Sequence, residues 1–128
     1  MSDSFWKKHW KYNYLFASEN PQIRVARTVF GVPISEKNWK LTLDFLTMKL
    51  KLTKKKEILD LCCGNGLVSI PFAKRVKTVY AIDYSNVLIK ELQSYRIPNI
   101  HAKCADANSL ILKKNSFDIN QLKLYYYQ

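Results

Sequence analysis

The strongest structural signal in this 128-residue chain is the stretch Ile58-Leu59-Asp60-Leu61-Cys62-Cys63-Gly64-Asn65-Gly66. A short apolar run that ends in glycines is typical of a buried parallel strand followed by a tight turn. Residues 67–76 then have a helical pattern, and Pro71 is tolerated only near the first turn of a helix. The sequence therefore predicts a strand, a glycine-bearing loop and a helix that begins close to Gly66.

The same alternation continues toward the C-terminus. Residues 78–83 are predicted to form a second strand, and Ser85 is suited to cap a helix that runs to about Tyr95. Residues 100–104 are predicted as a third strand, and Phe117 opens a fourth. Strands that alternate with helices indicate an α/β fold with a mostly parallel sheet and right-handed crossovers.

The N-terminal 56 residues are predicted to form a helical cap. Trp6, Trp10 and Tyr14 lie four residues apart, which favours a helix that docks by its aromatic face. Residues 21–30 are expected to form a second short helix, and Ser35 to cap a third that runs to about residue 51. The apolar positions of this third helix are Trp39, Leu43, Leu46 and Leu50.

The charge and the apolar pattern restrict the function classes. The chain has 21 Lys and Arg against 10 Asp and Glu, a net charge of +11 that would attract polyanions. Only Lys54-Lys55-Lys56 is a basic run, and it is shorter than a persuasive charge motif, so nucleic-acid binding is possible but not favoured. No apolar run approaches the about 18 residues of a membrane span, and no signal peptide is evident. We expect a cytoplasmic protein without membrane contact.

The cysteines do not indicate a metal centre. Cys62 and Cys63 are adjacent and Cys104 is distant, which fits neither a C-x-x-C knuckle nor a pairing framework. His9 and His101 lie near no cysteine pair. We therefore expect no metal site and predict reduced, buried thiols.

Two acidic residues frame the glycine loop. Asp60 precedes the turn, and Asp83 ends the second strand 17 residues after Gly66. Neighbouring parallel strands end at the same edge of a sheet, so Asp83 is expected beside the loop. A carboxylate there can accept hydrogen bonds from ribose hydroxyls.

The loop favours one adenosine-containing ligand over another. The frame Gly64-Asn65-Gly66-Leu67-Val68-Ser69 matches the G-x-G-x-x-G of dinucleotide sites only in part. Asp60 would repel a pyrophosphate at this place, whereas it suits a cationic amino group. This comparison favours S-adenosylmethionine over NAD.

Four motifs then follow one another in a recognisable order. They are the loop Asp60-Leu61-Cys62-Cys63-Gly64-Asn65-Gly66, Asp83, Ala105-Asp106-Ala107 and Phe117-Asp118. Asp60, Asp83 and Asp106 are separated by 23 and 23 residues, and Asp118 follows 12 residues later. In this order and spacing, residues 57–118 resemble the N-terminal half of a class I S-adenosylmethionine-dependent methyltransferase. Cys62 stands where the D/E-x-G-x-G-x-G loop of that family has its first glycine.

The resemblance implies a Rossmann-like core over residues 57–128 that binds S-adenosylmethionine, preceded by the cap of residues 1–56. It implies that the cofactor is held by Asp60, Cys62, Gly64, Asn65, Gly66, Asp83, Tyr84, Asp106 and Ala107. The loop backbone would hold the methionine part, with Asp60 near its amino group. The alternative is that Asp60 and Asp83 are only strand-end carboxylates.

The remaining implied contacts concern the adenosine part. Asp83 would bind the ribose hydroxyls, and Tyr84 would pack on the adenine. Asp106 would accept a hydrogen bond from the adenine amino group, while the N–H of Ala107 would donate to the ring. The alternatives are ordinary packing for Tyr84 and an Asx-type turn for Asp106.

The implied function is methyl transfer to an unidentified small-molecule acceptor. Such a reaction mainly requires alignment and the exclusion of water, so the lack of a catalytic dyad is no objection. A complete fold of this family has seven strands, whereas the chain has room for about four, and we expect a truncated fold. The alternatives are an S-adenosylmethionine-binding module or fragment that needs a partner chain, and an NAD-type oxidoreductase fragment. We also expect self-association through the exposed edge of the fourth strand.

Overall fold

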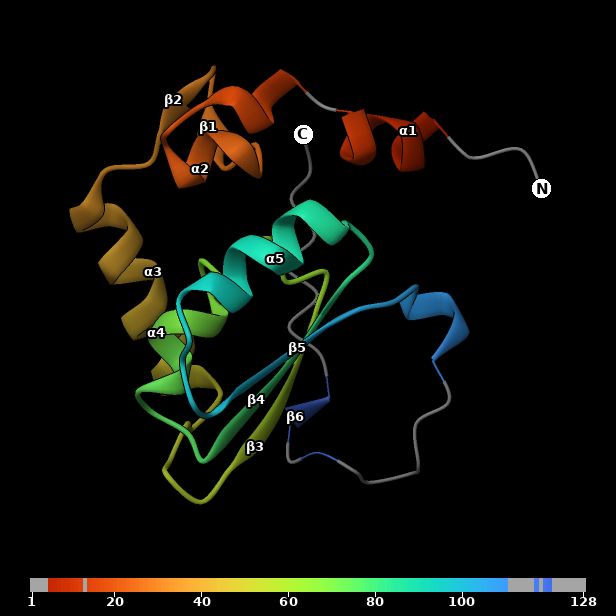
Figure 1. Ribbon diagram of the computed structural model, residues 1–128. Helices are drawn as coiled ribbons and strands as arrows, with labels where there is room; N and C mark the ends of the chain where they lie inside the picture. Colours follow the sequence, from red (N-terminus) through yellow and green to blue (C-terminus); the bar gives the residue numbers. More distant parts are fainter. Residues whose placement is uncertain (1–4, 13, 111–116, 118, 121–128) are drawn as a thin grey trace.

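The computed structural model describes residues 5–12, 14–110, 117 and 119–120 (Figure 1). The N-terminal part contains α1 (Phe5–Tyr12), the 3₁₀ helix η1 (Tyr14–Ala17), α2 (Pro21–Arg24), β1 (Thr28–Val29), β2 (Val32–Pro33) and α3 (Glu36–Lys49). The following part contains β3 (Glu57–Leu61), α4 (Ser69–Ala73), β4 (Thr78–Asp83), α5 (Asn86–Ser94), β5 (Ile100–Cys104), the 3₁₀ helix η2 (Ala107–Ser109) and β6 (Ile119–Asn120).

The larger sheet is parallel and has the strand order β5-β4-β3-β6. Leu61 lies opposite Ile82, and Asp83 lies opposite Cys104, so β3, β4 and β5 end at nearly the same level. The predicted α/β class with a Rossmann-like, mostly parallel sheet of about four strands is confirmed. Within the described residues, β6 pairs with β3 through Ile119 and Asn120.

The hydrophobic core lies on one face of this sheet. Ile58, Val79 and Ile100 are paired across the strands and share that face. They pack against side chains of three helices, namely Leu43 of α3, Phe72 of α4, and Ile89 and Leu92 of α5. Phe72 is fully buried, which contributes about 2–3 kcal/mol of hydrophobic stabilisation. The predicted apolar face of α3 is therefore confirmed.

The predicted helix caps are present. Ser35 Oγ accepts a hydrogen bond from the Asn38 N–H at 3.2 Å, and Ser85 Oγ accepts one from the Leu88 N–H at 3.5 Å. Each hydroxyl satisfies a backbone donor that has no partner inside its own helix. These two contacts fix the starts of α3 and α5.

The helix after the glycine loop begins later than the sequence predicts. Gly66 has φ +88°, which excludes it from a right-handed helix, and α4 begins at Ser69. The Gly66 carbonyl still accepts a hydrogen bond from the Ile70 N–H at 2.9 Å, so the chain turns helically before the regular helix starts. Pro71 is the third residue of α4 and lies in its first turn, as its missing N–H requires.

The prediction of a second helix over residues 21–30 is wrong beyond Arg24. Ala26 has φ +53°, and the chain then forms the antiparallel hairpin of β1 and β2. Phe30 and Gly31 form its turn with φ values of +49° and +78°, the conformation that tight hairpins favour. The N-terminal segment is therefore not purely helical.

Some predictions concern residues that the structure does not describe. The docking of the aromatic stripe depends on the side chains of Trp6 and Tyr14, and the tail predictions depend on Asp118 and residues 121–128. The first aromatic helix ends at Tyr12, and a separate 3₁₀ turn follows it. The division into two domains at residue 56 stays a prediction.

The thiols are only partly as expected. Cys63 is buried beside the core, whereas Cys62 and Cys104 are exposed because they stand at the ends of β3 and β5. The prediction of buried thiols is therefore wrong for two of the three. Within the described part of the chain, the histidine, cysteine and acidic side chains do not gather into a group that could hold a metal ion.

Among the described helices, none combines the length and the apolar character that crossing a membrane requires.

Candidate functional site

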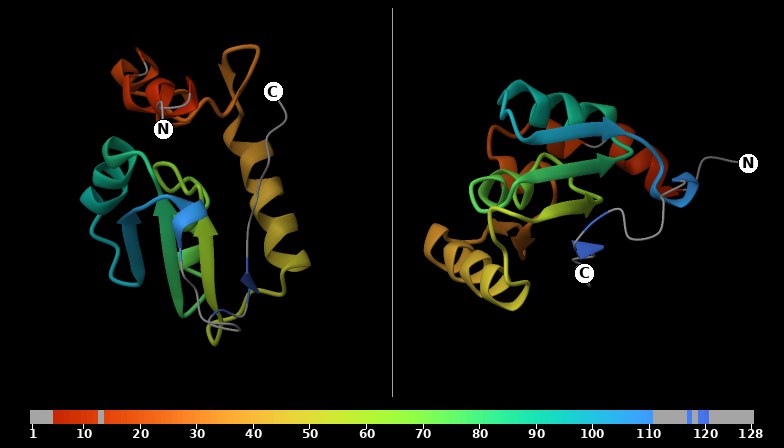
Figure 2. Two further views of the ribbon diagram at one scale, coloured as in Figure 1. Left: turned by 90° about the vertical axis from the view of Figure 1, so that its right-hand side faces the viewer. Right: turned by 90° about the horizontal axis from the view of Figure 1, so that it is seen from below.

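The candidate site lies at the carboxyl ends of β3, β4 and β5. Figure 2 shows α1 and its neighbouring segments beyond the end of the sheet toward which the strand arrows point. Two hydrogen bonds connect these parts: Asn65 Nδ2 donates to the Pro21 carbonyl at 2.9 Å, and Ser85 Oγ donates to the Trp10 carbonyl at 3.4 Å. The N-terminal segment therefore covers the loops that follow β3 and β4.

The loop after β3 reverses direction through alternate left-handed residues. Cys62, Gly64 and Gly66 have φ values of +57°, +56° and +88°. A Cβ atom on Gly66 would lie 2.4 Å from Cδ1 of Leu92, so any other residue would have to displace this buried side chain and would also be strained at φ +88°. A Cβ atom on Gly64 would lie 3.1 Å from Cγ1 of Val25, which packs over the loop. The backbone is thus held between α5 and the segment after α2.

Asp60 is a buried carboxyl at the start of this loop. It is 4% exposed, and Ser69 Oγ donates a hydrogen bond to it at 2.5 Å. Burial raises the pKa of Asp60 to about 6, while the Ser69 hydroxyl and the positive charge of Arg27 act in the opposite direction. A cationic group placed beside Asp60 would favour its ionised form.

Asp83 has a different environment at the end of β4. Its Oδ2 accepts a hydrogen bond from the Gly64 N–H at 2.9 Å, and its Oδ1 accepts one from the Ser85 N–H at 2.8 Å. Burial raises the pKa of Asp83, and these backbone donors counteract the rise. Each carboxylate oxygen has two acceptor positions, so the group retains capacity for ligand hydroxyls.

Tyr84, Asp106 and Ala107 follow β4 and β5. The Ala105 N–H donates to the Asp83 carbonyl at 2.9 Å, which holds the segment after β5 beside Asp83. Asp106 Oδ1 accepts a hydrogen bond from the Asn108 N–H at 2.9 Å and so caps η2. This is the Asx-type turn that the sequence analysis gives as the alternative role of Asp106. Tyr84 is half-buried, and Ala107 is the first residue of η2.

Asn65 lies in the loop but its side chain is turned toward the N-terminal segment. Besides Pro21, its Nδ2 contacts Glu91 Oε1 at 3.3 Å, and the side chain is buried. Its Oδ1 is buried and has no hydrogen-bond partner among the residues that the structure describes. Asn65 therefore joins the loop to α2 and α5 through its side chain.

The sequence did not predict the ion pair that joins α2 to α5 beside the loop. The guanidinium of Arg24 binds the carboxylate of Glu91 through Nε and Nη2 and also donates to the Ser18 carbonyl. Both side chains are 17% exposed. The two residues are 67 positions apart, and no local pattern connects them. We refer to Arg24, Glu91 and Asn65 as the clasp.

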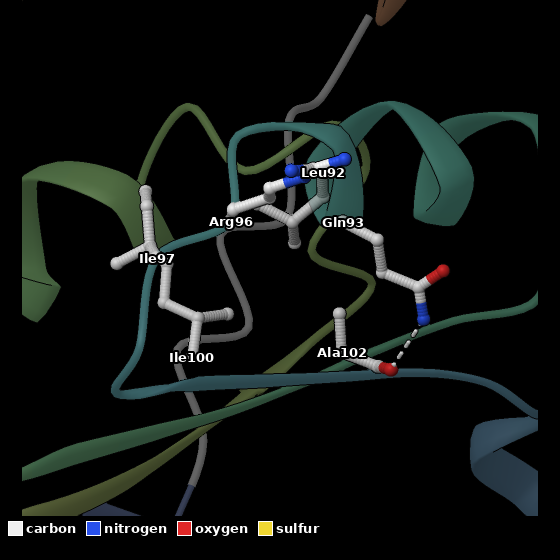
Figure 3. A pocket seen from close by; sticks show the side chains of 6 residues that line it. All are labelled: Leu92, Gln93, Arg96, Ile97, Ile100 and Ala102. Carbon is white, nitrogen blue, oxygen red and sulfur yellow. Dashed lines mark hydrogen bonds between the residues drawn. The ribbon is translucent and has the colours of Figure 1, made fainter.

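A hollow lies away from this candidate site, between the C-terminal half of α5 and β5 (Figure 3). Its lining residues are Leu92, Gln93, Arg96, Ile97, Ile100 and Ala102. Gln93 Nε2 donates to the Ala102 carbonyl at 3.0 Å across it. Except for Leu92, which also meets the loop at Gly66, these residues lie away from the glycine loop.

The geometry is that of an α/β protein whose candidate ligand site lies at the carboxyl ends of its strands. A glycine loop follows the first strand of the sheet, and an anchored carboxylate ends the second. Burial raises the pKa of the Cys63 thiol far above its ordinary range, so this thiol is a packing group rather than a nucleophile.

The methyltransferase domain family matches residues 58–124, which is more than half of the chain. The chain belongs to this family. Family membership indicates S-adenosylmethionine as the cofactor, and the buried carboxyl of Asp60 and the anchored carboxylate of Asp83 fit its cationic and ribose groups.

Two relatives are probable cobalt-precorrin-6B C(15)-methyltransferases. A probable cobalt-precorrin-6B C(15)-methyltransferase of Methanococcus maripaludis strain C7 is 34% identical over 96 residues, which are 72% of this chain and 50% of that protein. Its counterpart in Methanocaldococcus jannaschii is 33% identical over 89 residues, which are 70% of this chain and 44% of that protein. The chain spans about half the length of these relatives.

Solved structures share the fold. Phosphoethanolamine N-methyltransferase 1 of Haemonchus contortus superposes with a TM-score of 0.65 at 18% identity, over 89% of this chain and 22% of that chain. A dimethyladenosine transferase of Plasmodium falciparum gives a TM-score of 0.53 at 25% identity, over 60% of this chain and 29% of that chain.

Proposed function

We propose that this chain is the cofactor-binding part of an S-adenosylmethionine-dependent methyltransferase that acts on a small-molecule acceptor. One observation carries the proposal: a buried carboxyl and an anchored carboxylate flank a left-handed glycine loop in a chain of the methyltransferase domain family. The charge of this arrangement favours a cationic, adenosine-bearing ligand over a diphosphate.

The methionine end of the cofactor would lie against the loop after β3. The backbone from Cys62 to Gly66 approaches a ligand closely because Gly64 and Gly66 carry no side chain. Asp60 would accept from the ammonium group of the cofactor. This contact would favour the ionised form of a carboxyl whose pKa burial has raised.

The adenosine end would lie across the ends of β4 and β5. Asp83 would accept from the ribose hydroxyls with the acceptor positions that Gly64 and Ser85 leave. Tyr84 would pack on the adenine, Asp106 would accept from its amino group, and the Ala107 N–H would donate to its ring.

The chain's own residues would mainly orient and enclose the reactants. When bound, S-adenosylmethionine supplies an electrophilic methyl group that passes to a nucleophilic atom of the acceptor and leaves S-adenosylhomocysteine. The N-terminal segment lies over the loop through Pro21 and Val25, which would restrict the access of water. Alignment and exclusion of water need no acid–base pair from this chain.

The acceptor class is supported by the relatives. Those with names are described as acting on cobalt-precorrin-6B, which is a small molecule. The net charge of +11 is suited to an acceptor that carries negative charge. The proposal includes a cytoplasmic location, which cell fractionation would test.

A second candidate is a cofactor-binding module completed by a partner chain. The chain spans about half the length of its relatives, and among the described strands β6 is the outermost one beside β3. A sheet edge of this kind can pair with a further strand, including one from a second copy. Sedimentation equilibrium would show a dimer under this proposal, and a well-folded monomer at all concentrations would exclude self-association.

Calorimetry tests the cofactor assignment. The chain is titrated with S-adenosylmethionine, S-adenosylhomocysteine and NAD. Binding of the first two without NAD is expected, and binding of NAD alone would overturn the proposal. Transfer of a labelled methyl group to small molecules of a cell extract then separates an active enzyme from a binding module.

A further inference from the structure

Helix α3 is apolar on two sides, although only one of them is buried. Its inner side packs into the core through Leu43. Leu41, Phe45 and Met48 are spaced so that they form a second stripe, on the opposite side of the helix. These three residues are 59%, 53% and 64% exposed. A surface helix normally directs polar residues to solvent, so this outer stripe is suited to contact another apolar surface.

The same flank of the molecule carries further exposed apolar residues. The hairpin of β1 and β2 leads into α3 and lies above it in Figure 1 and in the left view of Figure 2. Val29, Phe30 and Val32 of this hairpin are exposed, Phe30 fully. Most of the exposed large apolar residues that the structure describes therefore lie between residues 29 and 48. Such a concentration in one segment indicates an interaction surface.

Exposed lysines stand at the C-terminal end of the outer stripe. The Nζ of Lys49 lies 5.5 Å from the ring centre of Phe45. The Lys51 N–H donates to the Met48 carbonyl at 3.2 Å, which keeps the following turn beside the stripe. Two more exposed lysines lie in that turn, before β3. We refer to the stripe and these lysines together as the basic flank, which consists of Leu41, Phe45, Met48, Lys49, Lys51, Lys54 and Lys55.

The positive charge of the basic flank exceeds the negative charge near it. Residues 36–56 contain seven lysines and two acidic residues. One of these acids, Asp44, is already paired with Lys40 and with Arg75 of α4, and the other, Glu36, stands at the far end of α3. A second copy placed symmetrically on this surface would bring like charges together. The charge therefore favours an anionic partner over a second copy of the chain.

Two kinds of anionic partner differ in how well they fit. A nucleic acid would engage the lysines through its phosphates, but it would leave the aliphatic side chains of Leu41 and Met48 without a matching surface. A bilayer with anionic lipid fits both features, because its headgroups attract lysines and its acyl boundary receives apolar side chains. The combination of stripe and lysines therefore favours a lipid surface.

We propose that the basic flank binds the surface of a membrane that contains anionic lipid. The chain would lie on the bilayer rather than cross it. The sequence alone did not predict this contact, because the stripe becomes an outer surface only when the other side of α3 packs into the core. The lysines precede β3, whereas the candidate cofactor site follows the carboxyl ends of the strands, so membrane and cofactor would not compete.

Co-sedimentation with vesicles tests the charged part of this surface. Vesicles of phosphatidylserine and phosphatidylcholine in equal parts should bind the chain at least about tenfold more strongly than phosphatidylcholine alone, and added salt should reduce the difference. Lys54→Gln combined with Lys55→Gln should weaken binding to the mixed vesicles about 10- to 30-fold. Lys90→Gln combined with Arg96→Gln is the matched control, since it removes two exposed charges on the α5 side, away from α3 (Figure 2). This control should stay within about twofold of the unaltered chain.

The apolar stripe requires a variant that keeps the net charge. Phe45→Gln retains a good helix former and should weaken binding to the mixed vesicles about 5- to 20-fold, because less apolar surface enters the bilayer. Val87→Gln makes the corresponding change at an exposed position of α5 and should leave binding unaltered. Circular dichroism and thermal unfolding show that each variant keeps its fold, independently of whether the chain binds a cofactor.

Several results would overturn the membrane assignment. The first is equal binding to both kinds of vesicle, or no binding to either. The second is vesicle binding that Phe45→Gln leaves unchanged. The third is binding of a single-stranded oligonucleotide, measured by fluorescence anisotropy, that depends on Lys54 and Lys55 while vesicle binding does not. Self-association that Phe45→Gln abolishes in sedimentation equilibrium would instead assign the stripe to an interface between two copies.

Discussion

The ends of β3 and β4 each present a carboxyl group to the same loop, but they hold it in opposite ways. Asp83 accepts two backbone N–H groups, one from Gly64 and one from Ser85, and so is part of the scaffold. Asp60 accepts from a side chain, Ser69, and burial, which raises the pKa of both carboxyls, brings that of Asp60 to about 6. The first carboxylate therefore positions the loop, whereas the second is suited to respond to a charged ligand.

This difference teaches that two acidic residues at equivalent strand ends need not have equivalent roles. A carboxylate anchored by backbone donors is already stabilised before any ligand arrives. A buried carboxyl with a raised pKa gains most when a cation reaches it. The variants below test this division of roles in order of expected effect.

Replacing Asp83 by alanine should have the largest effect. The change removes the acceptor for the Gly64 and Ser85 N–H groups together with the proposed ribose contacts. Affinity for S-adenosylhomocysteine should fall about 100-fold or more, measured by calorimetry. The free energy of unfolding in urea should also fall by about 1–3 kcal/mol, since buried donors lose their partner. An unchanged affinity would contradict the ribose assignment.

Replacing Glu91 by glutamine tests whether the clasp holds the N-terminal segment over the ends of both β3 and β4. The clasp connects α5, which follows β4, to α2, which lies over the loop after β3. Because the pair with Arg24 is only 17% exposed, its loss should lower the free energy of unfolding by about 1–2 kcal/mol. Limited proteolysis near residues 18–27 should become faster. The exposed pair of Lys40 and Asp44 provides a control, and Lys40→Gln should change neither property.

The pH dependence of binding sharpens the assignment of Asp60. With a pKa of about 6, this carboxyl is mostly protonated at pH 5 and mostly ionised at pH 7. The ammonium of the cofactor binds the ionised form, so affinity should rise about tenfold between these values. Asp60→Asn should bind more weakly and lose this rise. A tenfold rise that persists in Asp60→Asn would assign the titration to another group.

Without ligand, the sign of the pH effect is reversed. A carboxyl whose pKa is raised by folding binds its proton more tightly in the folded state than in the unfolded state. Asp60 therefore contributes stability below about pH 4, and this contribution is lost as the pH rises to about 6. Urea unfolding of Asp60→Asn across this interval should show a smaller decline than the unaltered chain.

The smallest expected effect concerns strain at the end of β3. Cys62 adopts a left-handed conformation that costs a residue with a side chain about 1–2 kcal/mol, whereas glycine adopts it readily. The greater freedom of glycine in the unfolded chain offsets part of this gain. Cys62→Gly should therefore raise the free energy of unfolding by about 0.5–1 kcal/mol. A fall in stability would show that the thiol makes a contact worth more than the strain.

The core elements were predictable because each has a local signal. Ile58, Val79 and the caps at Ser35 and Ser85 follow simple rules of apolar runs and hydroxyl capping, and the structure has them where expected. The relation of Asp83 to Gly64 was also predictable, since parallel strands that are neighbours end at the same edge.

The sequence-based predictions fail where the path of the chain depends on left-handed residues or on contacts between residues that are far apart in the sequence. Ala26 and Phe30 turn the chain with positive φ values although neither is glycine, so a helical pattern over residues 21–30 was misleading. Arg24 and Glu91 are 67 positions apart in the sequence, and Arg27 lies on the ring of Trp39 in another helix. Such contacts result from tertiary packing, and no local sequence pattern predicts them.

The most direct test of the central claim is to map S-adenosylhomocysteine on the chain by amide chemical shifts. We expect the largest changes at residues 62–66, 83–85 and 106–108, which follow β3, β4 and β5. The amides of Gln93, Arg96 and Ile97, at the hollow of Figure 3, should be unchanged. Changes that centre on that hollow, or none at saturating ligand, would contradict a cofactor site between the two carboxyl groups.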